Sequence, residues 1–405
     1  MTKQLLALLL LVAEVGWSQE ILSDRIKGLR INGTALAGMP VADLHSQGFV
    51  VEFDVSEKAP PDLRVRVLHC DRNWEVTRNG FVNDDMQNKS KAPLPYVRVP
   101  DGVRTYSYHY SVRIPGIAGI DQFKYSGNYV VEILDEGWKT VLGRGRFFVV
   151  ERKLPLTMKI NNRSLPSAKN PFNQVKKIEV GFSIPPPEDP NGEALFPILL
   201  KVSDIYRNRQ LYTPWRIDSD DRNPNTYIDG FGTSSLRFVV DNVAPGNAYR
   251  RIDLRDATVY PEDRILKDAK GADVRRFQMP PGSDNKGVSV LATGSRYADY
   301  VPFRFELASE RPEWGEIYVV SDFNGWKVSK PWLMSYDEQT QRYVCDVSIR
   351  RGVYDYQYVV GQDDWIILEG NDWRTSSVYS AFMYYQETRL GGYDRIVGFL
   401  QQTSQ

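Results

Sequence analysis

The sequence contains few of the side chains that metal binding and nucleophilic catalysis use. Its 405 residues include only three His (His45, His69 and His109) and only two Cys (Cys70 and Cys345). Neither Cys-x-x-Cys nor His-Glu-x-x-His occurs, and Gly-Lys and Gly-x-Ser-x-Gly are also missing. Zinc sites, phosphate-binding loops and hydrolase nucleophile elbows need these patterns. We therefore expect a protein that is not an enzyme and that holds no metal and no cofactor.

Two acidic patterns remain as candidates for chemistry. The segment from Asp218 to Asn225 resembles the opening of a calcium loop, but Arg222 stands where a third ligand would be needed. We interpret it as a solvated turn. His69 and Asp71 share one face of a predicted strand, yet the sequence places no serine or second base beside them. We therefore expect a structural role for this pair.

The chain also lacks an excess of charge of either sign. Lys and Arg together number 51, and Asp and Glu together also number 51. Proteins that bind nucleic acid normally carry a basic excess that replaces counterions, so we expect no nucleic-acid partner. Beyond the N-terminus no apolar run approaches the roughly 20 residues of a spanning helix, so we expect no direct membrane insertion.

Residues 1–18 have the pattern of a secretory signal peptide. Lys3 supplies a positive start, the run from Leu5 to Val12 is apolar, and small residues at Gly16 and Ser18 precede a cleavage point before Gln19. An N-terminal membrane anchor is the alternative, but the apolar run is short and Glu14 interrupts its end. The sequence thus predicts export from the cytoplasm.

Aromatic residues and turn formers are abundant. Aromatics make up 12% of the chain, with 30 Gly and 24 Pro. Apolar residues alternate with polar ones in several segments, among them 106–114, 49–55, 178–184, 301–307 and 343–349. This period of two is typical of strands with one buried face. We predict an all-β protein of tandem immunoglobulin-like or early-set β-sandwich domains with little helix.

Composition changes suggest three domains. We expect an N-terminal β-sandwich at 19–151, a middle β-sandwich at 156–297, a C-terminal β-sandwich at 298–394 and a loose tail at 395–405. Cys70 and Cys345 then lie in different domains. We interpret them as buried free thiols on strands; a disulfide in an oxidising compartment is the alternative.

The third block resembles the early-set domain of glycogen-binding modules. The similarity rests on Gly315–Trp326, on Gln341–Val347 and on Arg351–Val359, which contain the Phe-Asn-x-Trp turn and the Tyr-rich strand of that family. In members that bind glycan, two Trp side chains stack on sugar rings. The matching positions here are Trp326 and, more loosely, Trp365. A structural or protein-contact role for these side chains is the alternative.

Nearly the whole chain, about 20–400, is similar to the plug-protein family of the type IX secretion system. The motifs, in chain order, are Val67–Trp74, Gly80-Phe81, Tyr106–Tyr110, Ser126–Tyr129, Arg146–Val150, Asn170–Gln174, Arg250–Leu254, Tyr356–Tyr358, Glu369-Gly370 and Gly392–Gly398. Each motif is weak alone, but their order over the full length is specific.

The resemblance to the plug family implies a function. Such a protein is periplasmic and non-enzymatic, and it seals the periplasmic opening of the outer-membrane translocon barrel when no cargo-engaged partner is bound. The barrel is the implied partner. Aromatic and Arg side chains are frequent interface anchors, so Trp326, Trp332, Trp365, Trp373 and Arg374 are candidate partner or glycan contacts. A secreted α-glucan-binding protein that uses Trp326 and Trp365 is the alternative function.

Overall fold

The computed structural model describes residues 19–45, 48–84, 88–164, 174–184, 194–211, 214–261, 266–267, 282–294, 297–308 and 314–404. These residues form strands β1 to β25 and four short 3-10 turns, with no α-helix among them. The turns are η1 (Leu36–Gly38), η2 (Pro197–Leu199), η3 (Asp322–Asn324) and η4 (Lys330–Trp332). The prediction of an all-β protein is confirmed. The predicted signal peptide lies outside the described residues.

The first sandwich contains the N-terminal strands. One sheet has the order β1-β9-β8-β5, with β3 added in parallel to β9, and the other has the order β2-β4-β7-β6. The bounds are β1 (Gln19–Ile21), β2 (Ile26–Asn32), β3 (Val41–Asp43), β4 (Phe49–Val55), β5 (Arg64–Cys70), β6 (Tyr96–Arg98), β7 (Tyr108–Ile114), β8 (Gly127–Leu134) and β9 (Val141–Val150).

The alternation read from the sequence is present in this sandwich. In β7, Tyr108, Tyr110, Val112 and Ile114 are buried, whereas Ser111 and Arg113 are exposed. Successive side chains of a strand point to opposite faces, so one face of β7 enters the core between the two sheets. The same rule places Phe49, Val51, Phe53 and Val55 of β4 in that core.

The middle sandwich pairs two four-stranded sheets, ordered β10-β11-β15-β14 and β13-β12-β24-β25. The bounds are β10 (Thr157–Ser164), β11 (Gln174–Ser183), β12 (Val202–Arg207), β13 (Trp215–Asp218), β14 (Thr226–Asp229), β15 (Ser235–Val243), β24 (Val378–Glu387) and β25 (Tyr393–Thr403). Its second sheet therefore combines strands from two distant parts of the chain.

The third sandwich is built from the strands between these two parts. In one sheet β23 pairs with β16, β18 and β20; the other has the order β17-β19-β22-β21. The bounds are β16 (Arg250–Asp253), β17 (Leu266–Lys267), β18 (Val290–Leu291), β19 (Tyr300–Ala308), β20 (Ile317–Ser321), β21 (Ser335–Asp337), β22 (Arg342–Arg350) and β23 (Gly352–Val360). Its core includes Phe303, Phe305 and Cys345.

The sheets do not follow the boundaries that we expected from the sequence. Strand β16, at 250–253, pairs with β23 and belongs to the third sandwich, and β24 leaves the third block to pair with β12 of the middle one. The third sandwich is thus inserted into the middle one. The prediction of a loose tail at 395–405 is wrong for its described residues, because β25 continues to Thr403 in a ten-residue ladder with β24.

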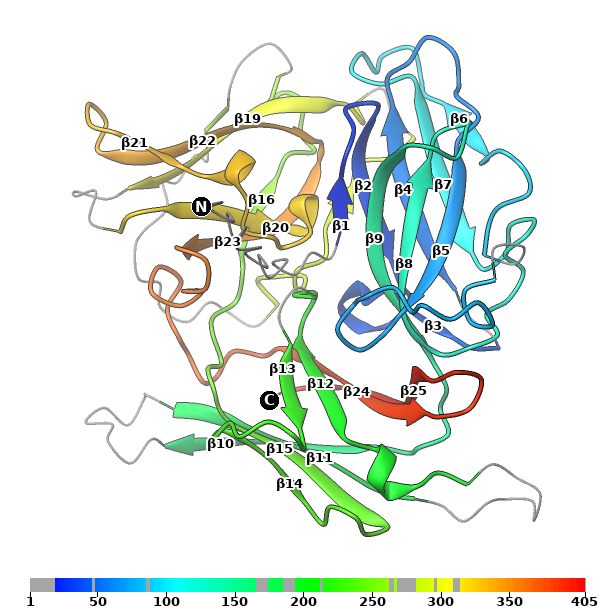
Figure 1. The fold of residues 1–405 in the computed structure, drawn as a ribbon. Coiled ribbons are helices and arrows are strands. Elements are labelled where there is room, and N and C mark those ends of the chain that lie inside the picture. The colour runs from blue at the N-terminus through cyan, green and yellow to red at the C-terminus, as the bar shows by residue number, and fades with distance from the viewer. Residues whose placement is uncertain are drawn as a thin grey trace, which may run out of the picture.

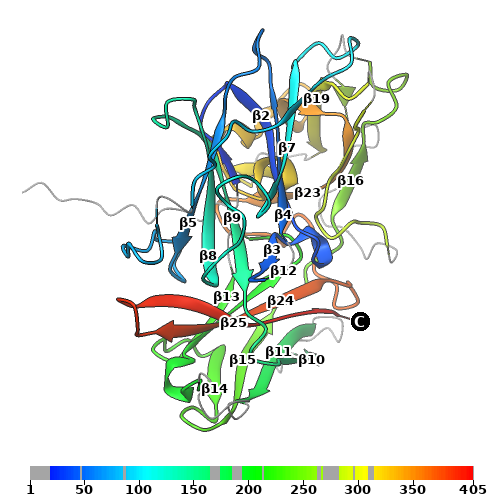
Figure 2. The ribbon, with the colours of Figure 1, turned by 90° about the vertical axis from the view of Figure 1, so that its right-hand side faces the viewer.

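The hairpin β24–β25 also joins the middle sandwich to the first. Tyr379, Ala381 and Met383 of β24 enter the core of the middle sandwich. Phe382 and Tyr384 point the other way and pack with Phe148 of β9, and the rings of Phe148 and Phe382 are stacked with centroids 4.1 Å apart. Figures 1 and 2 show the hairpin, in red, between the blue-to-cyan first sandwich and the green strands of the middle one. Both faces of β24 are therefore buried.

Candidate functional site

The three sandwiches meet around one buried carboxylate, that of Asp322 in η3. Its Oδ1 accepts a hydrogen bond from Nε of Arg209, at 2.7 Å, and its Oδ2 lies 3.5 Å from Nη2 of Arg30. Arg209 follows β12 of the middle sandwich and also donates to the carbonyl oxygens of Gly38 and Ile31 in the first. Burial alone would raise the pKa of Asp322, but Arg209 and Arg30 lower it below its ordinary value. The carboxylate is thus held ionised between two guanidinium groups.

A second buried carboxylate, Asp54 of β4, connects the first sandwich to the third. Both its oxygens accept hydrogen bonds from Nη1 of Arg350, at 3.0 and 2.9 Å, and Oδ2 accepts one from the Tyr300 hydroxyl at 2.9 Å. His109 Nδ1 lies 2.7 Å from Oδ1. Burial favours neutral His109, but hydrogen bonds to Asp54 and Glu52 outweigh it and raise its pKa to about 9. The protonated ring adds a second positive charge beside this carboxylate.

A third cluster connects the first sandwich to the β24–β25 hairpin. Arg395 donates to Glu151 at 2.7 Å and to Glu387 at 2.9 Å, and all three side chains are buried. Next to it, His69 Nε2 lies 3.2 Å from the carbonyl oxygen of Asp394. Burial lowers the pKa of His69 to about 4, so its ring is neutral. His69 is thus part of the contact between the first sandwich and the hairpin. The Asp71 carboxylate instead accepts hydrogen bonds from the Asn73 and Glu75 amides in the turn that follows β5.

These clusters lock the sandwiches together. A charge buried without a partner costs several kcal/mol, roughly 3–5 when one partner of a pair is removed. Sliding or opening one sandwich against another would separate Asp322 from Arg209, or Asp54 from Arg350, and would also expose the shared core around Phe148. Relative motion of the sandwiches is therefore energetically opposed at three places.

Sequence reasoning missed these clusters. In β4 and β22, Asp54 and Arg350 occupy the positions that strict alternation assigns to the outer, wet face. They are nonetheless almost fully buried, with side-chain exposures of 1% and 6%, because another sandwich covers that face. The only available signal was a charged residue on a strand, and this signal cannot distinguish solvent from a neighbouring domain.

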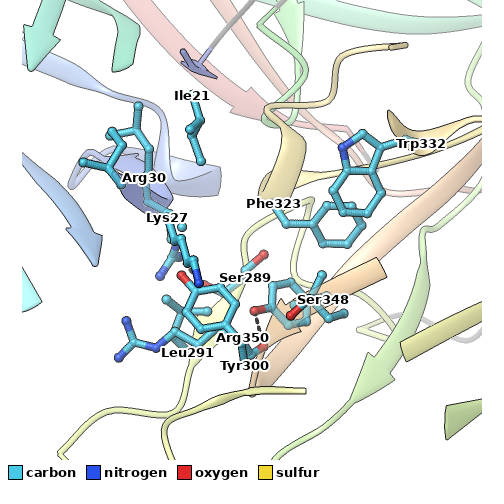
Figure 3. Close-up of a pocket in the computed structure, with 15 residues that line it drawn as sticks. Ile21, Lys27, Arg30, Ser289, Leu291, Tyr300, Phe323, Trp332, Ser348 and Arg350 are labelled. Atoms are coloured by element: carbon cyan, nitrogen blue, oxygen red, sulfur yellow. Dashed lines mark hydrogen bonds between the residues drawn. The ribbon is translucent and has the colours of Figure 1, made fainter. Parts of the chain in front are cut away.

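A cavity of about 310 Å³ lies at the contact between the first and third sandwiches. Its walls come from β2, from the segment around β18 and β19, and from η3, η4 and β22. A second hollow of about 370 Å³ adjoins it and shares Ile21, Leu29, Phe323 and Trp332 as walls. Figure 3 shows Phe323 and Trp332 on one side of the cavity, with Ile21, Lys27 and Arg30 on the other. This 310 Å³ space is the interdomain cavity.

The structure does not bring the predicted contact residues together. Trp326 is only 1% exposed and packs against Tyr249, with ring centroids 4.6 Å apart, on the outer side of the β20–β23 sheet. A buried ring offers no face to a sugar, so the prediction of Trp326 as a surface glycan contact is wrong for this conformation. Trp365 is half-buried against the same cluster.

The other three predicted residues have separate environments. Trp332 is half-buried, stacks on Phe323 and lines the interdomain cavity. Trp373 is half-buried in the segment before β24, and its carbonyl oxygen accepts a hydrogen bond from Lys176. Arg374 is exposed and paired with Asp372 at 2.7 Å. Of the five, only Trp332 lies in a cavity described above.

Both cysteines are free and buried, as predicted. Burial raises the pKa of Cys70 to about 12 and that of Cys345 to about 11, so both remain protonated at neutral pH.

Across the described residues, no group of three or more His, Cys, Asp or Glu side chains is placed to hold a metal ion. The 218–225 segment contains a turn in which the Asp220 amide donates to the Asp218 carboxylate, and the Asp220 side chain is well exposed. None of the described helical segments has the length and apolarity that crossing a bilayer requires.

This chain is similar over nearly its whole length to a solved structure. It is the crystal structure of a hypothetical protein from Parabacteroides merdae ATCC 43184, with 18% identity, a TM-score of 0.73, and coverage of 96% of this chain and 100% of that one. At this identity the match supports the fold. A bacterial ice-binding adhesin involved in host cell surface retention aligns over 93% of this chain and 95% of its own, but its identity is 11% and its TM-score of 0.12 carries no argument. No curated protein matches the sequence.

A family model identifies the first sandwich. Residues 26–151 match the model described as "Type 9 secretion system plug protein 1st domain". The matched range begins at the first residue of β2 and ends directly after β9, so it contains Arg30, Asp54 and Glu151 of the three clusters. Residues 26–151 of this chain therefore correspond to the first domain of type IX secretion system plug proteins, which supports the resemblance to that family.

Proposed function

We propose that this protein closes the periplasmic opening of the type IX secretion barrel as a rigid, non-enzymatic body. The match of residues 26–151 to the plug family is the observation that carries the proposal. Removal of residues 1–18 as a signal peptide would deliver the chain to the periplasm, where it would contact the outer-membrane translocon barrel when no cargo-engaged partner occupies it.

The connection between the sandwiches supports a mechanical role. A pore wide enough for folded cargo leaks solutes unless a stiff body covers it. In this protein, buried ion pairs at Asp322, Asp54 and Glu151 and a shared aromatic core oppose bending between the parts. A body that cannot bend at its joints keeps its sealing surface in one shape.

Because the plug must also leave the barrel, its affinity for the barrel has to be moderate. A specific protein contact generally buries at least about 1,000 Å², and its strength depends on a few anchors more than on its area. The proposed anchors remain Trp332, Trp365, Trp373 and Arg374, because none of them is fully buried. The last three lie in the segment between β23 and β24. We do not extend the proposal to α-glucan binding through Trp326, because that ring is buried.

The test uses a strain that lacks this protein but keeps the barrel. We expect its outer membrane to admit a large antibiotic or a dye, and the wild-type protein to restore the barrier. A tagged barrel should co-purify the wild-type protein. Trp373→Ala combined with Arg374→Glu should weaken that co-purification, whereas Asp253→Ala, at an exposed ion pair of the third sandwich, should not. Unchanged permeability together with no co-purification would refute the proposal.

A further inference from the structure

We propose that the interdomain cavity binds an anionic amphiphile, a molecule with an apolar chain and one carboxylate at its end. The proposal does not rest on plugging, since it concerns the chemistry of the cavity wall. At about 310 Å³ the cavity falls within the size range of small-molecule sites, about 300–1,000 Å³. The neighbouring hollow of about 370 Å³ shares four of its lining side chains with the cavity.

One side of the cavity suits an apolar chain. Phe323 and Trp332 lie almost parallel, with ring centroids 4.3 Å apart and planes at 18°, and they form a flat shelf. Ile21 and Leu29 of the first sandwich also line the space. These four side chains line both hollows, so an apolar chain bound in either hollow would contact them. Burying such a chain is favourable by about 25 cal/mol for each Å² removed from water.

The other side of the cavity is cationic. Lys27, Arg30 and Arg350 line it, and its lining residues include neither Asp nor Glu. Arg30 and Arg350 are already paired, with Asp322 and Asp54 respectively. Lys27 is different: its Nζ contacts the carbonyl oxygen of Thr105 at 3.4 Å, and within the described residues it makes no ion pair. Its charge is therefore available to an incoming carboxylate.

The wall also holds hydrogen-bond donors that the protein leaves unused. Within the part of the chain that the structure describes, Ser289 Oγ, Arg30 Nε and Arg350 Nε are buried and have no hydrogen-bond partner. All three side chains belong to the lining of the cavity, and Figure 3 places Ser289 between Lys27 and Phe323. A buried donor without a partner costs about 1–3 kcal/mol. These three atoms lie behind the cavity surface, so a ligand acceptor would reach one of them only after its side chain rotates toward the space.

The wall discriminates among ligand classes. Lys27, which makes no ion pair within the described residues, would repel a cationic ligand, whereas the charges of Arg30 and Arg350 are balanced by Asp322 and Asp54. A neutral sugar has many hydroxyl groups, and most of them would face Ile, Leu and aromatic side chains without a hydrogen-bond partner. A molecule with one charged end and an apolar remainder matches both sides of the cavity.

The first experiment is calorimetric titration of the full-length mature protein with decanoate, decanol and decylamine. Decanoate should bind with one site per chain, decanol more weakly, and decylamine not detectably. Replacing Lys27 by Gln should weaken decanoate binding about tenfold, because one charge-assisted bond is lost, and should leave decanol unchanged. Lys330→Gln, which removes an exposed lysine outside the cavity lining, is the matched control and should change nothing.

A second variant tests the place of binding without touching the ionic clusters. Ser348 is exposed and lines the cavity, so Ser348→Trp should obstruct the space while the fold is kept, which a thermal melt checks. It should abolish decanoate binding. Co-sedimentation with phosphatidylglycerol vesicles that Ser348→Trp abolishes would identify a membrane lipid as the source of the acyl chain. Binding of decanoate alone would point to a free carboxylate.

Three results would overturn the inference. They are no binding of decanoate or of vesicles by the folded wild-type protein, equal binding by Ser348→Trp, and tighter binding of a neutral maltooligosaccharide than of decanoate. The first two exclude a ligand site at this cavity, and the third assigns the site to sugars. None of them changes the expected permeability of the deletion strain, so this inference and the proposed function can fail separately.

Discussion

Removing the Asp54 carboxylate should weaken the attachment of the third sandwich to the first. Asp54→Ala deletes the acceptor of Arg350, Tyr300 and His109 in one step. The Arg350 side chain is only 6% exposed, so its charge would stay buried without its partner. Breaking a buried pair in this way costs about 3–5 kcal/mol.

The assay is urea unfolding of the mature protein at neutral pH, followed by tryptophan fluorescence. Asp54→Ala should lower the free energy of unfolding by about 3–5 kcal/mol. The control is Asp253→Ala, which breaks an exposed pair with Arg255 whose side chains are 47% and 56% exposed. An exposed pair contributes about 0–1 kcal/mol, so the control should be nearly silent.

A double variant separates the lost pair from the stranded charge. Asp54→Leu with Arg350→Met removes both charges and fills the same space with apolar groups, which is often neutral in stability. It should therefore be clearly more stable than Asp54→Ala. If Asp54→Ala loses no more stability than Asp253→Ala, or if the double variant is the least stable of the three, the argument that this buried pair locks the sandwiches fails.

The remaining predictions concern pH, packing and thiol chemistry. The pKa of His109 is raised from 6.5 to about 9, so its contribution to stability is complete below pH 6.5 and is lost as pH rises through about 9; thermal melts of His109→Gln should lose this alkaline slope. The pKa of His69 is lowered from 6.5 to about 4, so the unfolded chain takes up the proton first and stability falls as pH drops through this range; His69→Asn should flatten the acid side of the same melting curve, and an unchanged acid side would contradict the assignment. Phe382→Ala leaves a cavity in the core shared by the first and middle sandwiches and should cost about 3–5 kcal/mol in urea unfolding, a value that a loss below about 1 kcal/mol would refute. Cys70 and Cys345 should not react with a thiol reagent until urea is added, when both should react; rapid reaction of the native protein would show that one of them is accessible.

Local patterns in the sequence were sufficient for the fold class. Strand alternation depends only on neighbouring residues, because successive side chains point to opposite faces. The burial of Tyr110 and Val112 beside exposed Ser111 and Arg113 is an example. The family resemblance also came from ordered local motifs, and the match at 26–151 supports it.

Partnership between distant strands decided the rest. The sequence pattern of β24 is compatible with pairing to any exposed strand edge. In the structure β24 lies between β12 and β25, and its two faces pack into two different cores, which fixes this position. The outer face of β4 has the same sequence pattern whether water or another sandwich lies against it. The sequence therefore could not show that Asp54 is buried.

The amino-acid sequence alone therefore determined that the protein is built from strands and which family it resembles, and it favoured buried thiols over a disulfide for the two cysteines. Only the tertiary structure decided that the third sandwich is inserted in the middle one, that Trp326 is internal, and that Lys27 and Trp332 share a cavity. The physical reason is the distance along the chain between the residues that interact. Strand periodicity is written over a few residues, whereas charge pairing and ring packing between sandwiches join side chains hundreds of positions apart.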